Sequence, residues 1–260
     1  MLFFKAFLFI MIFLTFFWIV SVRIKNASIV DILWSLLFII ACSTYFFYDT
    51  NYYYREIIVL GLVSIWALRL SLHLAIRNIG KPEDYRYQNF RRDYGPKRYW
   101  WFSFFQVFLL QGTLAWIVSL PLLAINTKTH NNELFVLDYI GFLFWIIGFL
   151  FESIGDYQLK IFKRNIHNKG KVLKSGLWKY TRHPNYFGNA MMWIGFGLLG
   201  VSVGGYYNFI GSVIMVVLLL KVSGVRMLEA TLKETKPEYK DYIQSTNSFV
   251  PWFPKKNKHD

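Results

Sequence analysis

The stretch GLWKYTRHPNYFGNAMMWIGFGLLG, residues 176–200, decides between a soluble and a membrane fold. Its last six residues match the glycine pattern G-x-G-x-x-G of soluble dinucleotide-binding sheets. That pattern requires a preceding strand and an acidic residue about 20 positions further on. Here Gly195, Gly197 and Gly200 lie inside an apolar run that lacks both. These glycines therefore predict close packing of a membrane helix against a neighbouring helix.

The composition favours a protein embedded in a bilayer. The chain has 260 residues, of which 55% are hydrophobic, 20% aromatic and only 17% charged. The apolar residues form blocks about as long as a bilayer-spanning helix, roughly 20 residues. We therefore predict an all-α, multi-pass integral membrane protein with about seven transmembrane helices. The expected spans are Leu2–Val20, Ile29–Phe47, Glu56–Ile76, Phe104–Ile125, Leu134–Phe151, Phe187–Val203 and Tyr206–Val222.

The basic residues predict the orientation. Alternate connecting segments carry two, seven, eight and eight Lys or Arg residues, whereas the opposite side carries three and one lies within a span. Because cytoplasmic loops are enriched in Lys and Arg, this asymmetry predicts an N-terminus outside and a C-terminus in the cytoplasm. The net charge of +14 is thus explained by basic residues in the expected cytoplasmic loops, and it does not indicate a nucleic-acid-binding protein. The single cysteine, Cys42, excludes an intrachain disulfide, and we expect no metal site.

Charged groups within or beside the spans are costly and usually functional. Arg69 and His73 lie four residues apart on one helix face, as do Glu152 and Asp156. The two acids can hold donors of a ligand between them. Alternatively, Asp156 pairs with Lys160 and Glu152 with an arginine such as Arg69. The Arg69–His73 pair can likewise be an internal strut.

The stretch RHPNY has the features of an anion site at a helix start. Arg182 and His183 lie outside the bilayer, Pro184 presets the backbone, and Asn185 can cap the helix. Free N–H groups at a helix N-terminus together with basic side chains suit a phosphate. Rings that can flank a planar base belong to Tyr180 and Tyr186. The alternative is an ordinary juxtamembrane anchor, in which such residues lie at headgroup level.

The motifs together resemble the steroid 5α-reductase-like family of membrane proteins, and its bacterial-type branch in particular. The segments that carry the resemblance are GLWKYTRHPNYFGN, FFQVFLLQG (104–112), FESIGDYQLKIFKRN (151–165), LLLKVSGVRMLE (218–229), PEYKDYIQSTNSFVPWFP (237–254) and GKPEDYRYQNFRRDYG (80–95). The resemblance runs from about Asp31 to the end. The RHPNY element is shared more loosely with sterol C=C reductases and isoprenylcysteine carboxyl methyltransferases.

The resemblance implies seven membrane helices and NADPH bound from the cytoplasmic side by the C-terminal half. It divides one membrane domain into a substrate side, residues 1–103, and a cofactor side, residues 104–260. By similarity, the cofactor contacts are Arg69, Asp156, Lys163, Arg164, Tyr180, Asn185, Arg226 and Glu229. The other candidate cofactor residues are Glu152, Arg182, His183, Tyr186 and Asn189.

Two positions depart from the family pattern. Asn189 stands where the family usually has Glu, so an amide replaces a carboxylate. The catalytic tyrosine of true steroid reductases falls near Trp66, which has no phenolic proton. Reduction of an enone builds negative charge on its carbonyl oxygen, which needs a donor. The candidate catalytic residues are His73, Tyr85 and Tyr87 as donors, with Asp31 as an orienting group.

The sequence thus predicts an NADPH-dependent reductase that transfers hydride to a conjugated C=C bond of a lipid or steroid-like substrate. The alternatives are an S-adenosylmethionine-dependent methyltransferase and a non-catalytic lipid-binding membrane protein. We expect membrane lipids as partners, no nucleic acid, and a bacterial inner membrane rather than the endoplasmic reticulum. The tail Glu229–Pro254 predicts an amphipathic helix, and its segment SFVPWFP then returns to the membrane interface.

Overall fold

A computed structural model describes residues 1–222 and 224–255 and confirms the all-helical, multi-pass class, with no strand among these residues. Within them, six helices are long and apolar enough to cross a membrane. Their bounds are Leu2–Ile24, Ile29–Phe46, Tyr54–Asn78, Lys97–Val118, Val136–Arg164 and Tyr206–Thr235. The sixth expected span, Phe187–Val203, corresponds to α10 (Pro184–Ser202), a helix whose first turns include Asn185 and Asn189 and which is not among the six. The orientation of the termini stays a prediction.

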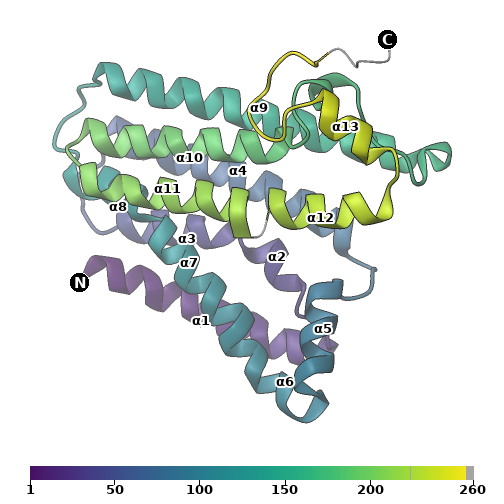
Figure 1. The fold of residues 1–260 in the computed structure, drawn as a ribbon. Helices are drawn as coiled ribbons and strands as arrows, with labels where there is room; N and C mark the ends of the chain where they lie inside the picture. The colour runs from purple at the N-terminus through teal and green to yellow at the C-terminus, as the bar shows by residue number, and fades with distance from the viewer. Residues whose placement is uncertain (223, 256–260) are drawn as a thin grey trace. The chain divides into compact units, whose positions relative to one another are not determined.

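The chain divides into two compact units, Met1–Leu134 with Val203–Asn208, and Phe135–Ser202 with Phe209–Asp260. The expected division into a substrate side and a cofactor side at residue 103 stays a prediction. The helices of the first unit, labelled in Figure 1, are α1 (Leu2–Ile24), α2 (Ile29–Leu33), α3 (Leu36–Phe46), α4 (Tyr54–Asn78), α5 (Tyr85–Tyr94), α6 (Pro96–Ser103), a π-helical turn (Phe104–Leu109), α7 (Leu110–Val118) and α8 (Leu120–Lys128).

The core of the first unit forms around α3, which packs against α1, α4, α7 and α8. Its side chains Phe38 and Cys42 are fully buried. The buried Tyr45 hydroxyl lies 2.8 Å from the Ser119 hydroxyl, so the hydrogen-bonding capacity of this polar pair is used inside the core. Phe38, Cys42 and this hydroxyl pair thus belong to the buried core of the first unit.

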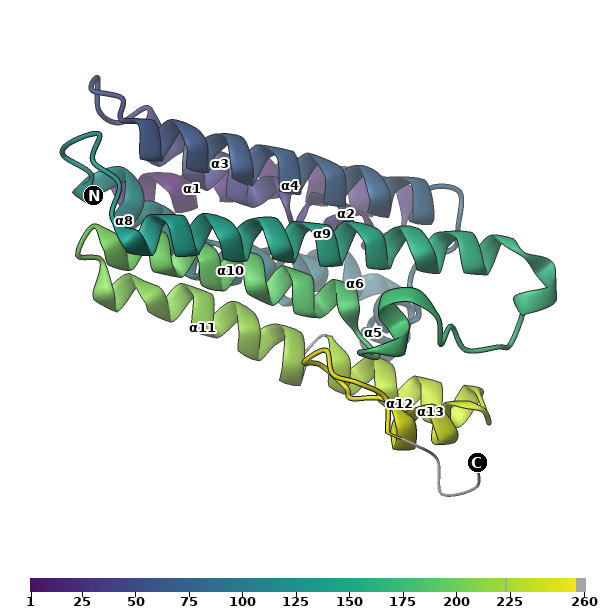
Figure 2. The same ribbon diagram turned by 90° about the horizontal axis from the view of Figure 1, so that it is seen from above.

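The second unit consists of α9 (Val136–Arg164), α10, α11 (Ile210–Val217), a π-helical turn (Leu218–Val222), α12 (Val225–Thr235) and α13 (Tyr239–Ser245). Helices α9 and α10 run side by side in both ribbon views (Figures 1 and 2). At the start of α9, the buried Asp138 carboxylate accepts the Phe135 backbone N–H at 2.7 Å and the Ser202 hydroxyl at 2.6 Å. This carboxylate ties the first turn of α9 to the last turn of α10.

Glycines allow the backbones of α9 and α10 to touch. A Cβ added at Gly195 would lie 2.6 Å from the Gly141 carbonyl oxygen, and one added at Gly188 would collide with the backbone at Gly148 and Glu152. The packing role expected for Gly195 is confirmed. Gly197 faces another neighbour, since a Cβ there would lie 2.6 Å from the Phe209 ring. The G-x-G-x-x-G letters therefore lie within a packed helix and follow no strand.

Candidate functional site

The RHPNY stretch leads into α10, which begins at Pro184. A short 3-10 turn, Gly176–Lys179, precedes it, and the Phe187 N–H donates to the His183 carbonyl at 3.0 Å. Proline favours the first helical position because its fixed φ suits the helix and it has no N–H to satisfy. Asn185 is therefore the second helical residue rather than the residue before the helix. Its Oδ1 still accepts a first-turn backbone N–H, that of Tyr186, at 3.0 Å. Arg182 and His183 occupy the turn just before the helix.

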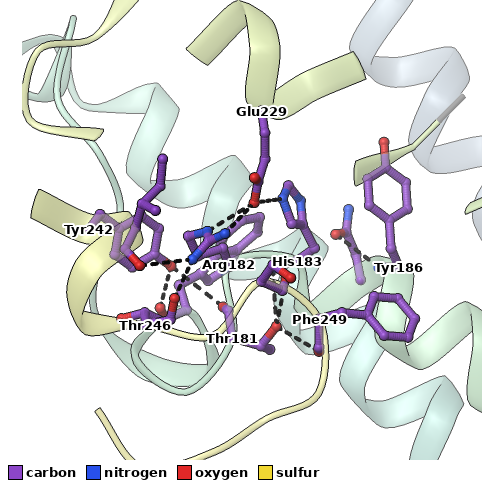
Figure 3. Close-up of polar contacts among 12 residues, drawn as sticks. Thr181, Arg182, His183, Tyr186, Glu229, Tyr242, Thr246 and Phe249 are labelled. Carbon is purple, nitrogen blue, oxygen red and sulfur yellow. Dashed lines mark hydrogen bonds and ion pairs between the residues drawn. The ribbon is translucent and has the colours of Figure 1, made fainter. Parts of the chain in front are cut away.

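Arg182 is buried, and all three nitrogens of its guanidinium donate hydrogen bonds within the second unit (Figure 3). Its Nε and Nη2 atoms donate to Glu229 Oε1 at 2.9 and 2.7 Å. Its Nη1 donates to the Thr246 carbonyl and, at 3.2 Å, to the Ile243 carbonyl. Those carbonyls lie at the C-terminal end of α13, where a cation is favoured by the helix dipole. Arg182 thus fastens the C-terminal segment to the start of α10.

Glu229, on α12, joins two residues of the RHPNY stretch. The oxygen that accepts from Arg182 also lies 3.2 Å from His183 Nε2 (Figure 3). His183 is only 1% exposed, and its ring stacks on that of Tyr186 with the centroids 5.7 Å apart. The carboxylate therefore fixes the imidazole orientation as well as the guanidinium. These contacts make the Arg182 guanidinium an internal fastener of the second unit, and its expected contact with the cofactor stays a prediction.

Helix α9 supplies two carboxylates that accept amides from α10. Asn185 Nδ2 donates to Asp156 Oδ1 at 3.1 Å, and Asn189 Nδ2 donates to Glu152 Oε2 at 3.3 Å. The two asparagines are four residues apart on α10, and the two acids are four residues apart on α9. Each pair therefore lies on one helix face, and the two faces meet. The pairing also accounts for the amide at position 189, since a glutamate there would place a second carboxylate beside Glu152.

Two buried polar atoms on this face are unsatisfied. His183 Nδ1 and Asn189 Oδ1 have no hydrogen-bond partner among the described residues. Leaving a buried polar atom unpaired costs about 1–3 kcal/mol, so such atoms in a native protein call for an explanation. In the tautomer that donates Nε2–H to Glu229, His183 Nδ1 is an acceptor, as is Asn189 Oδ1. A nicotinamide carboxamide or a ribose offers donors of that kind, so the residues present fit a nucleotide cofactor.

The other expected cofactor residues lie at several places. Lys163 and Arg164 end α9 and are exposed, as is Arg226 at the start of α12. Tyr180 is partly exposed, at 38%. Arg69 belongs to α4 in the first unit. The second unit therefore brings Arg182, His183, Tyr186 and Glu229 into one cluster and Asn185, Asn189, Glu152 and Asp156 into another.

Sequence reasoning missed the residues that complete the first cluster. Thr181 Oγ1 donates to the Phe249 carbonyl at 2.8 Å, and the Tyr242 hydroxyl donates to the Trp178 carbonyl. Burial raises the pKa of Tyr242 above its usual value, which keeps this hydroxyl protonated as a donor. The partners are mainly backbone carbonyls far away in the chain. A residue pattern carries no signal for such contacts.

The first unit holds a second polar cluster, built on two of the expected catalytic residues. The Tyr87 hydroxyl donates to Asp31 Oδ1 at 2.7 Å, and Arg86 Nη2 donates to Asp31 Oδ2 at 2.9 Å. Gln111 Nε2 in turn lies 3.3 Å from the Tyr87 hydroxyl. Burial, and then the Asp31 carboxylate, raise the pKa of Tyr87 well above its usual value. Tyr87 therefore stays a neutral phenol at any physiological pH.

The remaining expected donors are placed differently. His73 lies on α4, and Tyr85 begins α5 with 52% of its surface exposed. A surface pocket of about 280 Å³ opens between the start of α2 and the loop before α5, lined by Ser28 and Asp84 among others. The Asp84 N–H donates to the Ser28 hydroxyl at 2.7 Å, so the loop before α5 is tied to the start of α2. Asp31 and Tyr87 are thus the two expected catalytic residues that contact each other.

Replacing Tyr87 with phenylalanine tests whether this second cluster stabilises the first unit. The change removes the O–H that bridges Asp31 and Gln111 while keeping the ring. We expect a loss of about 1–3 kcal/mol in the free energy of unfolding, because both partners lose a buried hydrogen bond. Thermal unfolding in detergent measures it, with Tyr85→Phe as the control that leaves stability unchanged. Equal stability of the two variants would contradict the role of the Tyr87 hydroxyl.

Comparison with known proteins supports the expected resemblance. An uncharacterised protein of Schizosaccharomyces pombe is 24% identical over 259 residues, covering 90% of this chain and 75% of that protein. The human 3-oxo-5-alpha-steroid 4-dehydrogenase 1 is 35% identical over 66 residues, which cover 25% of this chain and 26% of the enzyme. A probable O-methyltransferase of Ustilaginoidea virens is 41% identical over 46 residues, or 18% of this chain and 16% of that protein.

No solved structure matches the chain. The chain spans only about a quarter of the length of the steroid dehydrogenase it matches, and that similarity suggests a membrane reductase. The resemblance to steroid 5α-reductases is confirmed at this level. The family described as protein of unknown function, DUF1295, matches residues 17–246, and the chain therefore belongs to the DUF1295 family.

Proposed function

We propose that the protein is a membrane-embedded, NADPH-dependent reductase that transfers hydride to a conjugated C=C bond of a lipid or steroid-like substrate. The observation that carries this proposal is the similarity to 3-oxo-5-alpha-steroid 4-dehydrogenase 1, which extends to the human and the mouse enzymes. The helices are apolar enough to lie in a bilayer, where such a substrate dissolves and can enter laterally. We expect that bilayer to be a bacterial inner membrane.

The charge of the second unit supports a phosphorylated cofactor. The sequence contains no Asp or Glu between Asp156 and Glu229. The same interval includes nine exposed basic residues, namely Lys160, Lys163, Arg164, Lys169, Lys171, Lys174, Lys179, Lys221 and Arg226. NADPH carries several phosphate charges, whereas S-adenosylmethionine carries none. A positive, acid-free surface therefore favours NADPH, since it raises the local concentration of an anionic ligand.

The protein's own contribution to the reaction is placement and electrostatics. When bound, NADPH supplies the hydride. The chain must hold a donor for the carbonyl oxygen on which negative charge develops. Among the candidates His73, Tyr85 and Tyr87, we favour Tyr87, because its hydroxyl is buried, neutral and oriented by Asp31. On the cofactor side, His183 Nδ1 and Asn189 Oδ1 would accept hydrogen bonds from the nucleotide.

One observation favours a second candidate, methyl transfer from S-adenosylmethionine. The probable O-methyltransferase is 41% identical, although over only 46 residues. The buried acceptors His183 Nδ1 and Asn189 Oδ1 would also suit the amino and hydroxyl groups of that cofactor. S-adenosylmethionine carries no phosphate, and its sulfonium and ammonium groups outweigh its one carboxylate. The exposed basic surface therefore favours NADPH, so we place reduction first.

Cofactor binding by the purified protein in nanodiscs distinguishes the two. Energy transfer from the ten tryptophans to the nicotinamide reports NADPH, with NADH as a comparison and S-adenosylmethionine as competitor. We expect saturable NADPH binding that S-adenosylmethionine leaves unchanged. The double variant Lys163→Gln/Arg164→Gln should weaken it about tenfold or more, since each lost charge contact to a phosphate costs about 1 kcal/mol.

The matched control is Lys240→Gln, an exposed lysine of α13, which should bind like the wild type. Arg182→Ala is unsuitable as a ligand probe because Arg182 fastens the tail. Absence of NADPH binding by folded wild-type protein would refute the reductase proposal. Tight binding of S-adenosylmethionine in its place would assign the site to methyl transfer.

A further inference from the structure

The segment after α13 carries large apolar side chains that face outwards. Val250 is 59% exposed, Trp252 66% and Phe253 75%. The segment lies beyond the six helices that can cross a membrane. Single exposed apolar residues are normal on a protein surface, but three within four positions form a patch. Outside a transmembrane helix, such a patch marks a surface that contacts something other than water.

Hydrogen bonds hold this segment in one conformation. The Trp252 N–H donates to the Tyr180 carbonyl at 2.9 Å, and the Arg182 N–H donates to the Asn247 carbonyl at 2.9 Å. The ring of Phe253 packs edge-on against Tyr180, with the centroids 6.2 Å apart. Tyr180, Val250, Trp252 and Phe253 therefore form one fixed surface, which we call the aromatic tail surface.

Positive charge flanks the aromatic tail surface. Lys179 precedes Tyr180, and Lys255 follows Phe253 by two residues; both lysines are exposed. The Lys255 N–H donates to the Ser245 carbonyl at 2.8 Å, which keeps this lysine with the fixed part of the tail. From residue 242 to residue 255 the sequence contains no Asp or Glu. The surface is therefore aromatic at its centre and cationic at its edges.

We propose that the aromatic tail surface docks on the headgroup layer of an anionic phospholipid bilayer. Trp and Tyr rings prefer the membrane interface, where the ring is shielded and its polar atom stays hydrated. Lysines next to such rings are attracted to anionic headgroups within a Debye length of the surface. The same tail supplies the Ile243 and Thr246 carbonyls to Arg182. Docking of the tail would therefore also stabilise these hydrogen bonds next to His183. The proposal is independent of the cofactor.

A spin label tests the docking directly. Cys42 is the single cysteine and is buried, so a Cys42→Ala background allows one label to be placed at will. Pro254→Cys puts the label beside the intact rings, and Lys240→Cys puts the control label on exposed α13. Accessibility to oxygen, which partitions into lipid, and to a water-soluble nickel chelate is measured in nanodiscs of phosphatidylcholine with and without phosphatidylglycerol.

We expect the ratio of oxygen to chelate accessibility at position 254 to exceed that at position 240, and to rise severalfold when phosphatidylglycerol is present. Trp252→Ala/Phe253→Ala should return the label at 254 to the value of the control. Lys179→Gln/Lys255→Gln should remove the dependence on anionic lipid while the protein stays folded by circular dichroism.

Three outcomes would overturn the proposal. A label at 254 that is as open to the chelate as the control shows that the surface faces water. A label shielded from both reagents shows that protein covers it. Oxygen accessibility that is equal in neutral and anionic bilayers shows that the anionic headgroups play no part.

Discussion

Arg182→Ala is expected to release the C-terminal segment from the start of α10. The change removes four donated hydrogen bonds and leaves Glu229, whose side chain is 14% exposed, without its strongest partner. Breaking a buried ion pair on one side typically costs about 3–5 kcal/mol, because the remaining charge is uncompensated. Arg182→Lys should recover only part of this, since an ammonium cannot reach Glu229 and both carbonyls at once.

Hydrogen exchange of residues 239–252 and the thermal unfolding temperature measure this effect. The matched control is Lys174→Ala, an exposed cation in the loop before α10, which should leave both unchanged. Glu229→Gln should reproduce part of the loss, because an amide accepts a weaker hydrogen bond than a carboxylate. If the backbone amides of residues 239–252 exchange as slowly in Arg182→Ala as in the wild type, Arg182 does not fasten the tail.

Gly188→Ala is expected to separate α9 from α10. The added methyl group would collide with the Gly148 carbonyl oxygen and the Glu152 backbone N–H. Backbone cannot move aside as a flexible side chain can, so we expect a loss of about 3 kcal/mol or more, at the high end of overpacking. Separation would also stretch the amide–carboxylate pair between Asn189 and Glu152, which is already 3.3 Å long.

Gly61→Ala provides the control with the opposite expected sign. Gly61 lies within α4, and a Cβ there would have no neighbour within 4 Å. Alanine should stabilise the helix by about 0.5–1 kcal/mol, since glycine is the poorer helix former. Thermal unfolding of both variants in the same detergent tests the pair. If Gly188→Ala and Gly61→Ala shift the unfolding temperature alike, the close α9–α10 contact does not contribute as described.

The sequence predicted most helices because hydropathy is a strong local signal, but it misplaced some ends. The fifth span was expected to end at Phe151, whereas α9 continues to Arg164. Hydropathy falls at Glu152 and Asp156, yet both are buried because Asn189 and Asn185 lie opposite them. A window of hydropathy cannot anticipate a polar partner on another helix.

The fourth span shows a different limit. It was expected to run unbroken over residues 104–125, but α7 ends at Val118 and α8 begins at Leu120. Pro121 has no N–H and clashes with the preceding turn, which favours a new helix start there. The candidate membrane segment therefore lies earlier, at Lys97–Val118. Pro121 is a local signal for a helix break, but the apolar run around it favours one continuous span, so hydropathy alone predicts no break.

The sequence identified several residues of the site but not the contacts between them. RHPNY was identified as a functional stretch, and Glu229 was expected near it by resemblance. For Arg182 the structure adds contacts that the sequence did not predict, because its guanidinium donates to Glu229 and to carbonyls of the tail. An exposed phosphate ligand and a buried fastener look alike in a sequence. Only the distant residues Ile243 and Thr246 distinguish them.

The central claim is hydride transfer from NADPH to a membrane lipid, and double isotope labelling tests it most directly. Membranes with and without the protein receive NADPH deuterated at C4 of the nicotinamide, on either face, together with methyl-deuterated S-adenosylmethionine. Lipids are then compared by mass spectrometry. The account predicts protein-dependent deuterium from NADPH in a lipid that has lost one C=C bond. Deuterated methyl groups in the lipids, with no deuterium from NADPH, would contradict it.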